Sequence, residues 1–497
     1  MRRHSSAAVL TGLTLLASGI VVGLPVTAAS AARPTPVEPS VARLALTSVD
    51  ATSVRRLPGP LSRRPLLLSA PRVTRDFTTV GVTWRHDERV RGVAVQLRWR
   101  SAGRWSGWRS LEVDADHAPD PGSVEDTATV RDGTAPLWVG PSDGVQVRVD
   151  QRRGARPRDV RIELVDPGSS PADAPVSLPR SVARAAQPRP EIVTRAQWGA
   201  DESIRRGEPT YTSPAKVGFV HHTATANGYS QAQAAAMVRS VYAFHVKSRG
   251  WSDIGYNLLV DRFGRVYEGR AGGVDRWVLG THTGGHNSAS FAVSLLGSYD
   301  SSSPGASTMA ALQKTLAWKL GLAYRNPAGT TTLTSAGGGT SRFAAGTTNS
   351  FAVVSGHRDA GTTACPGAAT YARMGEIRRG VTAYLGAGFV SPSLVDGAER
   401  VQGSTQPVTL ATRTVNRTDW RLEVSRGGQV VRTLTGTADG ALVPQWDLTF
   451  DGGYPALPGT YALRLTGTGA DGSVALPWTT SVRVTGTGTS RWRPVSR

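Results

Sequence analysis

The chain has 497 residues, too many for one compact domain, and 39% of them are hydrophobic, which is enough to form real cores and excludes a chain that is disordered throughout. Its 57 lysines and arginines exceed 37 aspartates and glutamates, and the net charge of +20 favours anionic partners. A single cysteine excludes an internal disulfide framework.

The first 31 residues are typical of a secretory signal peptide. Arg2 and Arg3 precede an apolar run that ends near Val26, and small residues follow at 29–31. Because the apolar run is nearly long enough to cross a bilayer, an uncleaved anchor is the alternative. Gly and Pro interruptions and the Ala-rich site favour cleavage. We therefore expect a secreted or cell wall-associated protein with no membrane span after signal removal.

The N-terminal third predicts a tether, a β domain and a linker in that order. Residues 32–74 contain Pro and Arg without periodicity, as in VRRLPGPLSRRP, and predict an extended tether. In VAVQLRW and DGVQVRVD apolar and polar residues alternate, so residues 75–165 predict a small antiparallel β domain. Residues 166–188 are rich in Pro, Ala and Ser and predict a linker.

Between residues 189 and 388 the pattern changes to alternating strands and helices. This alternation predicts an α/β domain, a mixed sheet with helices packed on it. The predicted elements are strand 216–222, helix 230–250, hairpin 256–269, strand 290–299, helix 309–324 and strand 351–357, with a Gly/Thr-rich loop before the last strand.

Residues 400–486 again alternate in the β pattern, with glycine turns between the runs. They predict a C-terminal β-sandwich that resembles immunoglobulin-like domains in its QWDLTFDGGYPALPGTYALRL stretch. Leu448 stands where that pattern has a glycine. Because this region contains no His and no Cys, we expect attachment or spacing from it and no chemistry.

Histidines and the cysteine concentrate in the α/β region. Six of the nine histidines lie between residues 221 and 357, and Cys365 follows closely. His221 and His357 each end a predicted strand, so both rings can meet at one sheet edge. Three N and S donors with no fourth protein ligand match a catalytic zinc site. Spacing alone leaves two alternatives: an inert packed thiol, or a nucleophilic Cys365 paired with His357.

Five ordered motifs carry a family resemblance. VTRAQWGA, VHHTA, RGWSDIGYNLLVDRFGRVYEGR, GTHTGGHNSASFAVSLLGSY and SGHRDAGTTACPG cover about residues 190–385. Together they resemble the peptidoglycan recognition protein family, which includes zinc-dependent N-acetylmuramoyl-L-alanine amidases. The flanking regions are similar to those of exported actinobacterial cell-wall amidases.

The resemblance implies one Zn²⁺ per chain, held by His221, His357 and Cys365, and no organic cofactor. It places the conserved tyrosine of the family at Tyr256, and Thr363 at a position where members carry lysine or threonine. Zinc in such a site activates water and polarises the scissile carbonyl. The two side chains can then donate hydrogen bonds to the developing oxyanion. His222 points to the opposite side of its strand and is not expected to bind zinc.

The resemblance also implies a substrate groove. In this family a Gly-Trp pair at residues 250–251 accompanies stem peptides that bear diaminopimelate. The alternative is that Trp251 only packs beside the helix. The implied groove residues are His245, Arg249, Gly250, Trp251, His282 and Asn287.

The sequence thus predicts a secreted, monomeric zinc amidase that cuts the amide between the muramic acid lactyl group and L-alanine. Its partners would be peptidoglycan or muropeptides and, through its positive charge, anionic wall polymers. One alternative is a recognition protein that binds muropeptides without cutting them, and another is a metal-free Cys–His hydrolase. Nucleic acid is not an expected partner, because the basic residues are dispersed and not interleaved with aromatics.

Overall fold

The computed structural model describes residues 36–57, 65–114, 117–173, 189–339 and 341–486. The predicted signal peptide, residues 1–31, lies outside these ranges, as does the predicted linker from residue 174 to 188. Within the described ranges, the helices are all too short or too polar to cross a bilayer.

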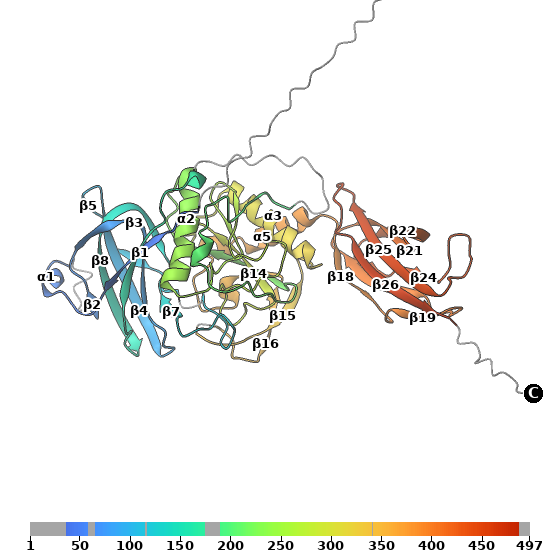
Figure 1. Cartoon of the computed structure of the whole chain (residues 1–497), viewed down its shortest axis with the longest axis horizontal. Coiled ribbons are helices and arrows are strands. Elements are labelled where there is room, and N and C mark those ends of the chain that lie inside the picture. Colours follow the sequence, from blue (N-terminus) through green and yellow to red (C-terminus); the bar gives the residue numbers. More distant parts are fainter. Residues whose placement is uncertain (1–35, 58–64, 115–116, 174–188, 340, 487–497) are drawn as a thin grey trace, which may run out of the picture. The chain divides into compact units, whose positions relative to one another are not determined.

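The N-terminal domain is an antiparallel sheet built on two long strands, β3 and β8, and it confirms the predicted β domain (Figure 1). Its core consists of inward-facing apolar residues such as Val82, Leu97 and Val147. Its strands are β1 (Ser40–Ala45), β2 (Leu67–Leu68), β3 (Arg72–Arg85), β4 (Val90–Ser101), β5 (Arg104–Trp105), β6 (Arg109–Leu111), β7 (Arg131–Gly133), β8 (Leu137–Gly154) and β9 (Arg161–Asp166).

The predicted tether over residues 32–74 is wrong for most of its described part. Strand β1 pairs with β9, β2 pairs with β8, and a short helix, α1 (Ala51–Val54), lies between them. Leu46 and Leu68 are buried in the domain core. An edge strand held by backbone bonds on one side needs little apolar periodicity, so the Arg- and Pro-containing sequence did not reveal it.

The predicted linker is also shorter than expected at its start. A 3-10 turn, η2 (Pro171–Asp173), follows β9, and Asp173 forms an ion pair with the buried Arg239 at 2.7 Å. The Arg239 guanidinium also donates to the carbonyls of Pro167 and Trp198. These bonds satisfy a buried cation, so residues 166–173 are packed chain and not spacer.

The central domain is the predicted mixed sheet with helices packed on it. The strand order is β10-β13-β12-β14-β11-β17, and only the β12–β13 hairpin is antiparallel. Its strands are β10 (Ile192–Val193), β11 (Val217–His222), β12 (Leu258–Val260), β13 (Val266–Glu268), β14 (Ser290–Leu295) and β17 (Val354–Gly356). The Gly/Thr-rich loop contains a further hairpin, β15 (Thr330–Thr334) with β16 (Thr348–Ala352).

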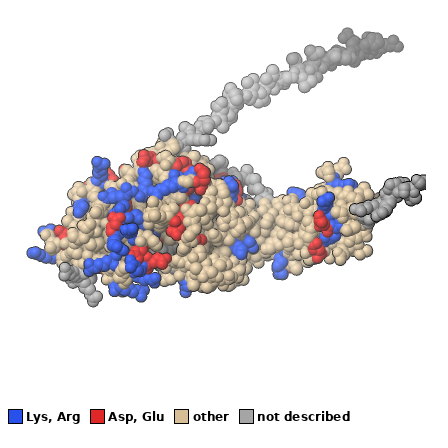
Figure 2. Space-filling view, turned by 60° about the horizontal axis from the view of Figure 1, so that its bottom comes forward, with Lys and Arg blue, Asp and Glu red and all other residues tan. Residues whose placement is uncertain are grey.

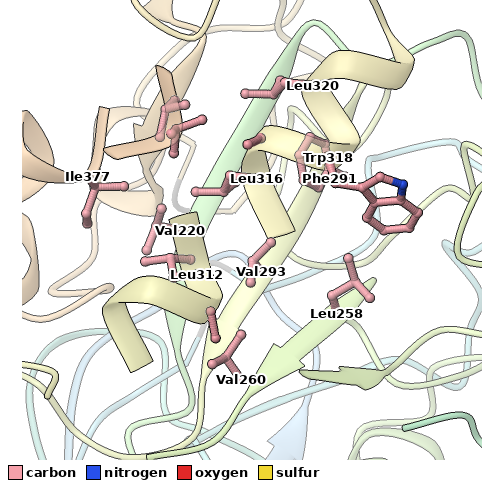
Figure 3. Close-up of a cluster of buried hydrophobic side chains, with 14 of the residues drawn as sticks. Val220, Leu258, Val260, Phe291, Val293, Leu312, Leu316, Trp318, Leu320 and Ile377 are labelled. Atoms are coloured by element: carbon pink, nitrogen blue, oxygen red, sulfur yellow. The ribbon is translucent and has the colours of Figure 1, made fainter. Parts of the chain in front are cut away.

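Helices pack on this sheet through two apolar clusters. One cluster joins the sheet to α3 (Ala306–Leu322) and α5 (Met374–Leu385), with Val220, Val293, Leu312 and Leu316 at its centre (Figure 3). The other cluster joins it to α2 (Gln231–Ala243), which continues as a π-helical turn, η4 (Phe244–Ser248). The predictions at 230–250 and 309–324 are confirmed as helices, whereas α5 and the short α4 (Ala368–Tyr371) were not predicted.

The C-terminal domain consists of two sheets around a common apolar core, as the β-sandwich prediction requires. It begins at Phe389, earlier than the predicted residue 400. Leu448 is buried and has φ +59°, the left-handed conformation that explains the glycine expected there. Its strands are β18 (Phe389–Leu394), β19 (Glu399–Val401), β20 (Val408–Thr414), β21 (Thr418–Arg426), β22 (Gln429–Ala438), β23 (Ala441–Leu442), β24 (Gln445–Trp446), β25 (Gly459–Gly469) and β26 (Trp478–Thr485).

Candidate metal centre and substrate groove

Two parallel strands bring His221 and His357 together at one edge of the central sheet. Strand β11 pairs with β17, with Val220 opposite Gly356. The next residues, His221 and His357, therefore follow at the same level of the sheet. The two ring centroids lie 4.5 Å apart, and both side chains are fully buried. The sequence prediction that the carboxyl ends of these strands place both rings at the same edge is confirmed.

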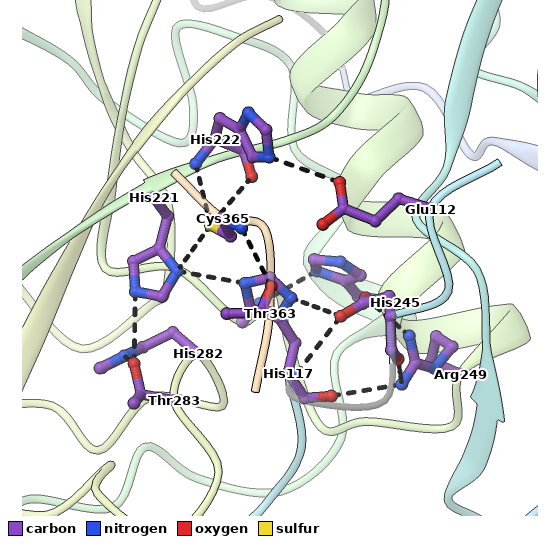
Figure 4. Close-up of polar contacts among 12 residues, drawn as sticks. Glu112, His117, His221, His222, His245, Arg249, His282, Thr283, Thr363 and Cys365 are labelled. Atoms are coloured by element: carbon purple, nitrogen blue, oxygen red, sulfur yellow. Dashed lines mark hydrogen bonds and ion pairs between the residues drawn. The ribbon is translucent and has the colours of Figure 1, made fainter. Parts of the chain in front are cut away.

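Cys365 reaches the same point from the loop that follows the 3-10 turn η5 (His357–Asp359) (Figure 4). Its Sγ lies 3.7 Å from Nδ1 of His221 and accepts a hydrogen bond from the backbone N–H of His222 at 3.3 Å. The Cys365 N–H donates to Oγ1 of Thr363, which fixes the loop. A backbone N–H directed at sulfur favours the thiolate form that a metal needs.

These three side chains fit a zinc ion by donor type and by protonation state. Two imidazole nitrogens and a thiol are the ligand types that zinc prefers. Burial lowers the pKa of His221 and His357 well below the usual value, and neighbouring histidines lower it further, so both rings are neutral. Nε2 of His221 lies 3.3 Å from the Thr283 hydroxyl, and a proton held there leaves Nδ1 free to coordinate.

A fourth donor, not predicted from the sequence, comes from the N-terminal domain. His117 places Nε2 3.1 Å from Nδ1 of His221, and its ring lies 4.6 Å from the ring of His357. The candidate ligand atoms of His117, His221, His357 and Cys365 all lie within 4.8 Å of one another. Four buried N and S donors at this spacing can surround one metal ion.

His117 is held in place by Asp114. The Asp114 carboxylate bonds Nδ1 of His117 through Oδ1 and accepts from Arg249 at 2.8 Å through Oδ2. Burial alone would raise the pKa of Asp114, but the adjacent His117 and Arg249 together keep it well below the usual range. A carboxylate on the far nitrogen of a histidine is the usual support of a metal ligand.

Tyr256 and Thr363, the predicted catalytic residues, lie beside the donors. The Tyr256 hydroxyl is 3.4 Å from Nε2 of His117, and its ring is 5.6 Å from that of His221. Thr363 and Tyr256 line the same small cavity, together with Cys365 and His117. Its volume of about 10 Å³ has room for about one water molecule.

Arg249 and Gly250, predicted to line the substrate groove, are covered by the N-terminal domain. Arg249 is 1% exposed and donates to the Asp114 carboxylate and to the carbonyls of Asp114, His117 and Arg131. Gly250 has φ +79°, and any Cβ there would collide with the carbonyl of Thr129. Glycine is therefore required both by the backbone conformation and by this contact.

The remaining predicted groove residues are buried too. Trp251 is fully buried, with its ring 4.4 Å from that of His245 and under the Arg249 guanidinium. His245 accepts from the Gly255 N–H through Nδ1, and burial lowers its pKa well below the usual value. Both side chains are therefore packed in the interior, and the role of Trp251 in substrate selection stays a prediction.

His282 and Asn287 form one hydrogen-bonded turn. The Asn287 side-chain oxygen accepts from the backbone N–H groups of His282 and Thr283, and its amide donates to Asp120 and to the Ala118 carbonyl. Burial lowers the pKa of His282 to about 3, so its ring is neutral. Three of the predicted groove residues, Arg249, Gly250 and Asn287, thus form hydrogen bonds with the N-terminal domain.

His222 does not join the donor cluster. Its Nδ1 accepts from the Tyr299 N–H, and its Nε2 lies 3.4 Å from Glu112. The alternation of side chains along β11 directs it away from His221, as expected.

No sequence signal placed His117 and Asp114 at this site. They lie in a stretch without strand periodicity, more than one hundred residues before His221. The one usable feature was the acidic character of residues 112–126 next to an isolated histidine, in an otherwise basic region.

Two families match separate parts of the chain. The N-acetylmuramoyl-L-alanine amidase family matches residues 211–368, and the Rv3811 N-terminal galactose-binding domain-like family matches residues 45–177. The second match begins before residue 75, in agreement with the strands found in the predicted tether.

Curated relatives match the central domain. Peptidoglycan-recognition protein SC2 of Drosophila simulans is 31% identical over 177 residues, which are 35% of this chain and 80% of the relative. The human N-acetylmuramoyl-L-alanine amidase is 37% identical over 135 residues, which are 26% of this chain and only 22% of that protein. A solved ectodomain complex of peptidoglycan recognition proteins LCa and LCx with tracheal cytotoxin is 28% identical, with a TM-score of 0.29, covering 36% of this chain and 92% of that one.

Proposed function

The chain belongs to the peptidoglycan recognition protein family, and we propose that it is a secreted, zinc-dependent N-acetylmuramoyl-L-alanine amidase. It would hydrolyse the amide between the lactyl group of muramic acid and L-alanine. The observation that carries this proposal is the buried set of His221, His357 and Cys365 beside the hydroxyl of Tyr256.

The alternative within the family is a protein that binds muropeptides without cutting them. Binding alone needs no metal centre, and three buried N and S donors gathered at one point are the arrangement that a shared metal ion requires. His221 and His357 are neutral, and the Cys365 sulfur accepts a hydrogen bond from a backbone N–H. Both features suit the coordination of a metal ion. These features favour the enzyme.

In the proposed reaction, each side chain of the site has a separate role. Zinc, when bound, supplies an electrophile for the scissile carbonyl and an acidified water as nucleophile. Tyr256 donates its hydroxyl proton in a hydrogen bond to the carbonyl oxygen as negative charge develops there. Thr363 holds the Cys365 loop and supplies a second hydroxyl next to the same cavity, and Thr283 keeps the His221 tautomer that can coordinate.

The groove suits an anionic stem peptide. Arg249 and Arg270 are buried cations that each bind a carboxylate in this structure, Asp114 and Glu125 respectively. Substrate carboxylates could take these places by the same charge-assisted bonds. With Gly250 and Trp251 at the positions that resemble the diaminopimelate-reading pair, we propose diaminopimelate-type peptidoglycan as substrate.

The exposed charge favours attachment to anionic polymers of the wall. Figure 2 shows Lys and Arg side chains gathered over part of the visible face, among fewer Asp and Glu side chains. Such a surface attracts polyanions in a salt-sensitive manner. The exposed arginines of the N-terminal domain include Arg85, Arg89, Arg91, Arg152, Arg153 and Arg158.

The deciding experiment measures metal content and cleavage of a soluble diaminopimelate muropeptide on wild type and Cys365→Ser. We expect one zinc per chain and release of free stem peptide, even if slow, in wild type. The variant and a chelated sample should lose both. Full zinc occupancy with muropeptide bound and no product would support a recognition protein. Activity that survives chelation but not alkylation of Cys365 would support a Cys–His hydrolase.

A further inference from the structure

We propose that the N-terminal domain keeps the metal centre latent: His117 is a fourth zinc ligand, and the segment from residue 117 to 130 occupies the substrate groove. This inference rests on the proposed amidase function and adds an intramolecular inhibitor to it. The segment consists of turns without strands, and its His117 lies beside His221 and Cys365 (Figure 4). Asp114, just before the segment, belongs to the same contact through Arg249.

The first argument is the closure of the ligand set. A catalytic zinc site keeps one position open for water or substrate, whereas a site with four protein ligands is structural in type. His117 fills the fourth position, since its Nε2 lies within 4.8 Å of the other three donors. Asp114 orients the ring through Nδ1, so Nε2 is directed at the cluster.

The second argument is that three buried carboxylates of the N-terminal domain bind the groove. Asp114 pairs with Arg249. Asp120 accepts from the Gly285 N–H at 2.8 Å and from the Asn287 side chain at 2.7 Å. Glu125 pairs with Arg270 at 2.7 Å and also accepts from the Ser252 hydroxyl.

These contacts imitate what an anionic ligand would make. A stem peptide presents carboxylates and backbone groups to cations and N–H donors. Here Arg249, Arg270, the Gly285 N–H and the Asn287 amide already bind carboxylates of the N-terminal domain. All three carboxylates are less than 8% exposed, so water does not compete for them. Thr129 completes the cover by packing its carbonyl directly against Gly250.

The third argument is the space that remains. The cavity beside Tyr256, Thr363 and Cys365 measures about 10 Å³ and is lined on its other side by Asp114 and His117. This volume holds about one water molecule and excludes a muramyl peptide. Pro121 packs against Gly338, so the Gly/Thr-rich loop also meets the segment. With the segment in place, this cavity therefore gives a muramyl peptide no room beside Tyr256 and Cys365.

The ligand assignment is tested on the full-length zinc protein with His117→Ala. X-ray absorption at the zinc edge should change from three imidazole nitrogens and one sulfur to two nitrogens, one sulfur and one oxygen. Chelator competition should show zinc bound at least about tenfold more weakly, as expected for a lost ligand. At saturating zinc, kcat/KM for the soluble muropeptide should rise at least about tenfold.

His86→Ala is the matched control. His86 is the other described histidine of this domain, and its Nδ1 also bonds an aspartate, Asp132, at 2.8 Å, but the side chain is half exposed and away from the donor cluster. This variant should keep the zinc environment, zinc affinity and activity of wild type.

The groove contact is tested separately with Asp120→Ala, which removes the bonds to Gly285 and Asn287. The affinity for a muropeptide, measured by calorimetry in the presence of zinc, should rise at least about fivefold. Asp126→Ala is its control, because Asp126 is exposed and its carboxylate accepts only from Gly122 within the segment. An Asp120→Ala protein that binds muropeptide no better than wild type would contradict the occupied groove.

The outcomes separate this inference from the proposed function. If His117→Ala keeps the wild-type zinc environment while Cys365→Ser loses zinc and activity, the amidase stands and the fourth ligand is wrong. If His117→Ala changes the zinc environment but lowers activity, His117 assists catalysis and latency is wrong. If the zinc environment changes as expected and no variant releases peptide, the fourth ligand stands and the amidase proposal fails.

Discussion

The hydroxyl of Tyr256 lies beside the proposed metal ligands and can offer a proton in a hydrogen bond. It lies 3.4 Å from Nε2 of His117, and its ring is buried against His221 and His245. Tyr256→Phe should lower kcat for muropeptide cleavage by about 100- to 1,000-fold, because one oxyanion donor is lost. Zinc content and KM should stay as in the parent protein.

The comparison is best made in both wild type and the His117→Ala background, with steady-state kinetics and metal analysis on the same preparations. A Tyr256→Phe protein with unchanged kcat in both backgrounds would show that the tyrosine only packs the site, which is the structural role its burial also permits.

Thr283 contacts His221, one of the proposed zinc ligands. Its hydroxyl lies 3.3 Å from Nε2, the nitrogen that does not face the cluster. Thr283→Val keeps the shape of the side chain and removes this partner, so zinc affinity should fall by about 10- to 100-fold. Competition with a chromophoric chelator measures it. Thr334→Val, on the exposed hairpin strand β15, is a control that should leave zinc affinity unchanged.

At this scale the strand ends predicted that His221 and His357 meet, and the family motifs predicted Cys365 and Tyr256 beside them, which is where the structure has these side chains. It could not predict His117 or Asp120, because a contact between residues more than one hundred positions apart leaves no local pattern in one sequence. The burial of Arg249 and Gly250 was missed for the same reason: their own motif indicates a groove, and only the fold shows what lies over it.

Among the elements, helix α5 has a clear amphipathic pattern in its sequence. Met374, Ile377, Val381 and Leu385 are buried along one face of the helix, and they recur at helical spacing. In contrast, β1 and the β15–β16 hairpin are largely exposed and are held more by backbone pairing than by side-chain burial. Strong amphipathic elements are thus readable from sequence, whereas short edge strands are not.

Ile377 anchors α5 to the sheet that positions His221 and His357. It is fully buried in the cluster with Val220 and Leu312. Ile377→Ala should destabilise the central domain by about 2–5 kcal/mol, the usual cost of such a cavity. The measurement is the thermal transition assigned to this domain with zinc bound.

Arg379→Ala, on the exposed face of the same helix, should shift that transition little, within about 0.5 kcal/mol. Equal effects of the two substitutions would mean that α5 is held by its helical propensity and not by the buried face.

At the scale of the whole molecule, the proposed zinc ion would join two domains that the sequence presents as separate. The predicted order of β, α/β and β regions agrees with the sheets that the structure contains. Composition and periodicity describe each domain alone, however, and carry no information on the bonds between them. Those bonds include His117 with His221, Asp120 with Asn287 and Glu125 with Arg270.

If zinc is bound by both domains, removing it should loosen the contact between them as well as the site itself. The reporters are the amides of Gly285 and Asn287, which donate to the Asp120 carboxylate. In wild type, chelation should speed hydrogen exchange at these amides by at least about tenfold, because the metal no longer stabilises the docked state. In His117→Ala the exchange should already be fast, and chelation should add little. Amides of β4 should exchange at one rate in all samples, since this strand pairs only within the N-terminal sheet. If chelation leaves the exchange rates at Gly285 and Asn287 unchanged in wild type, the carboxylate bonds alone hold the segment in the groove. Zinc would then be bound by the central domain only.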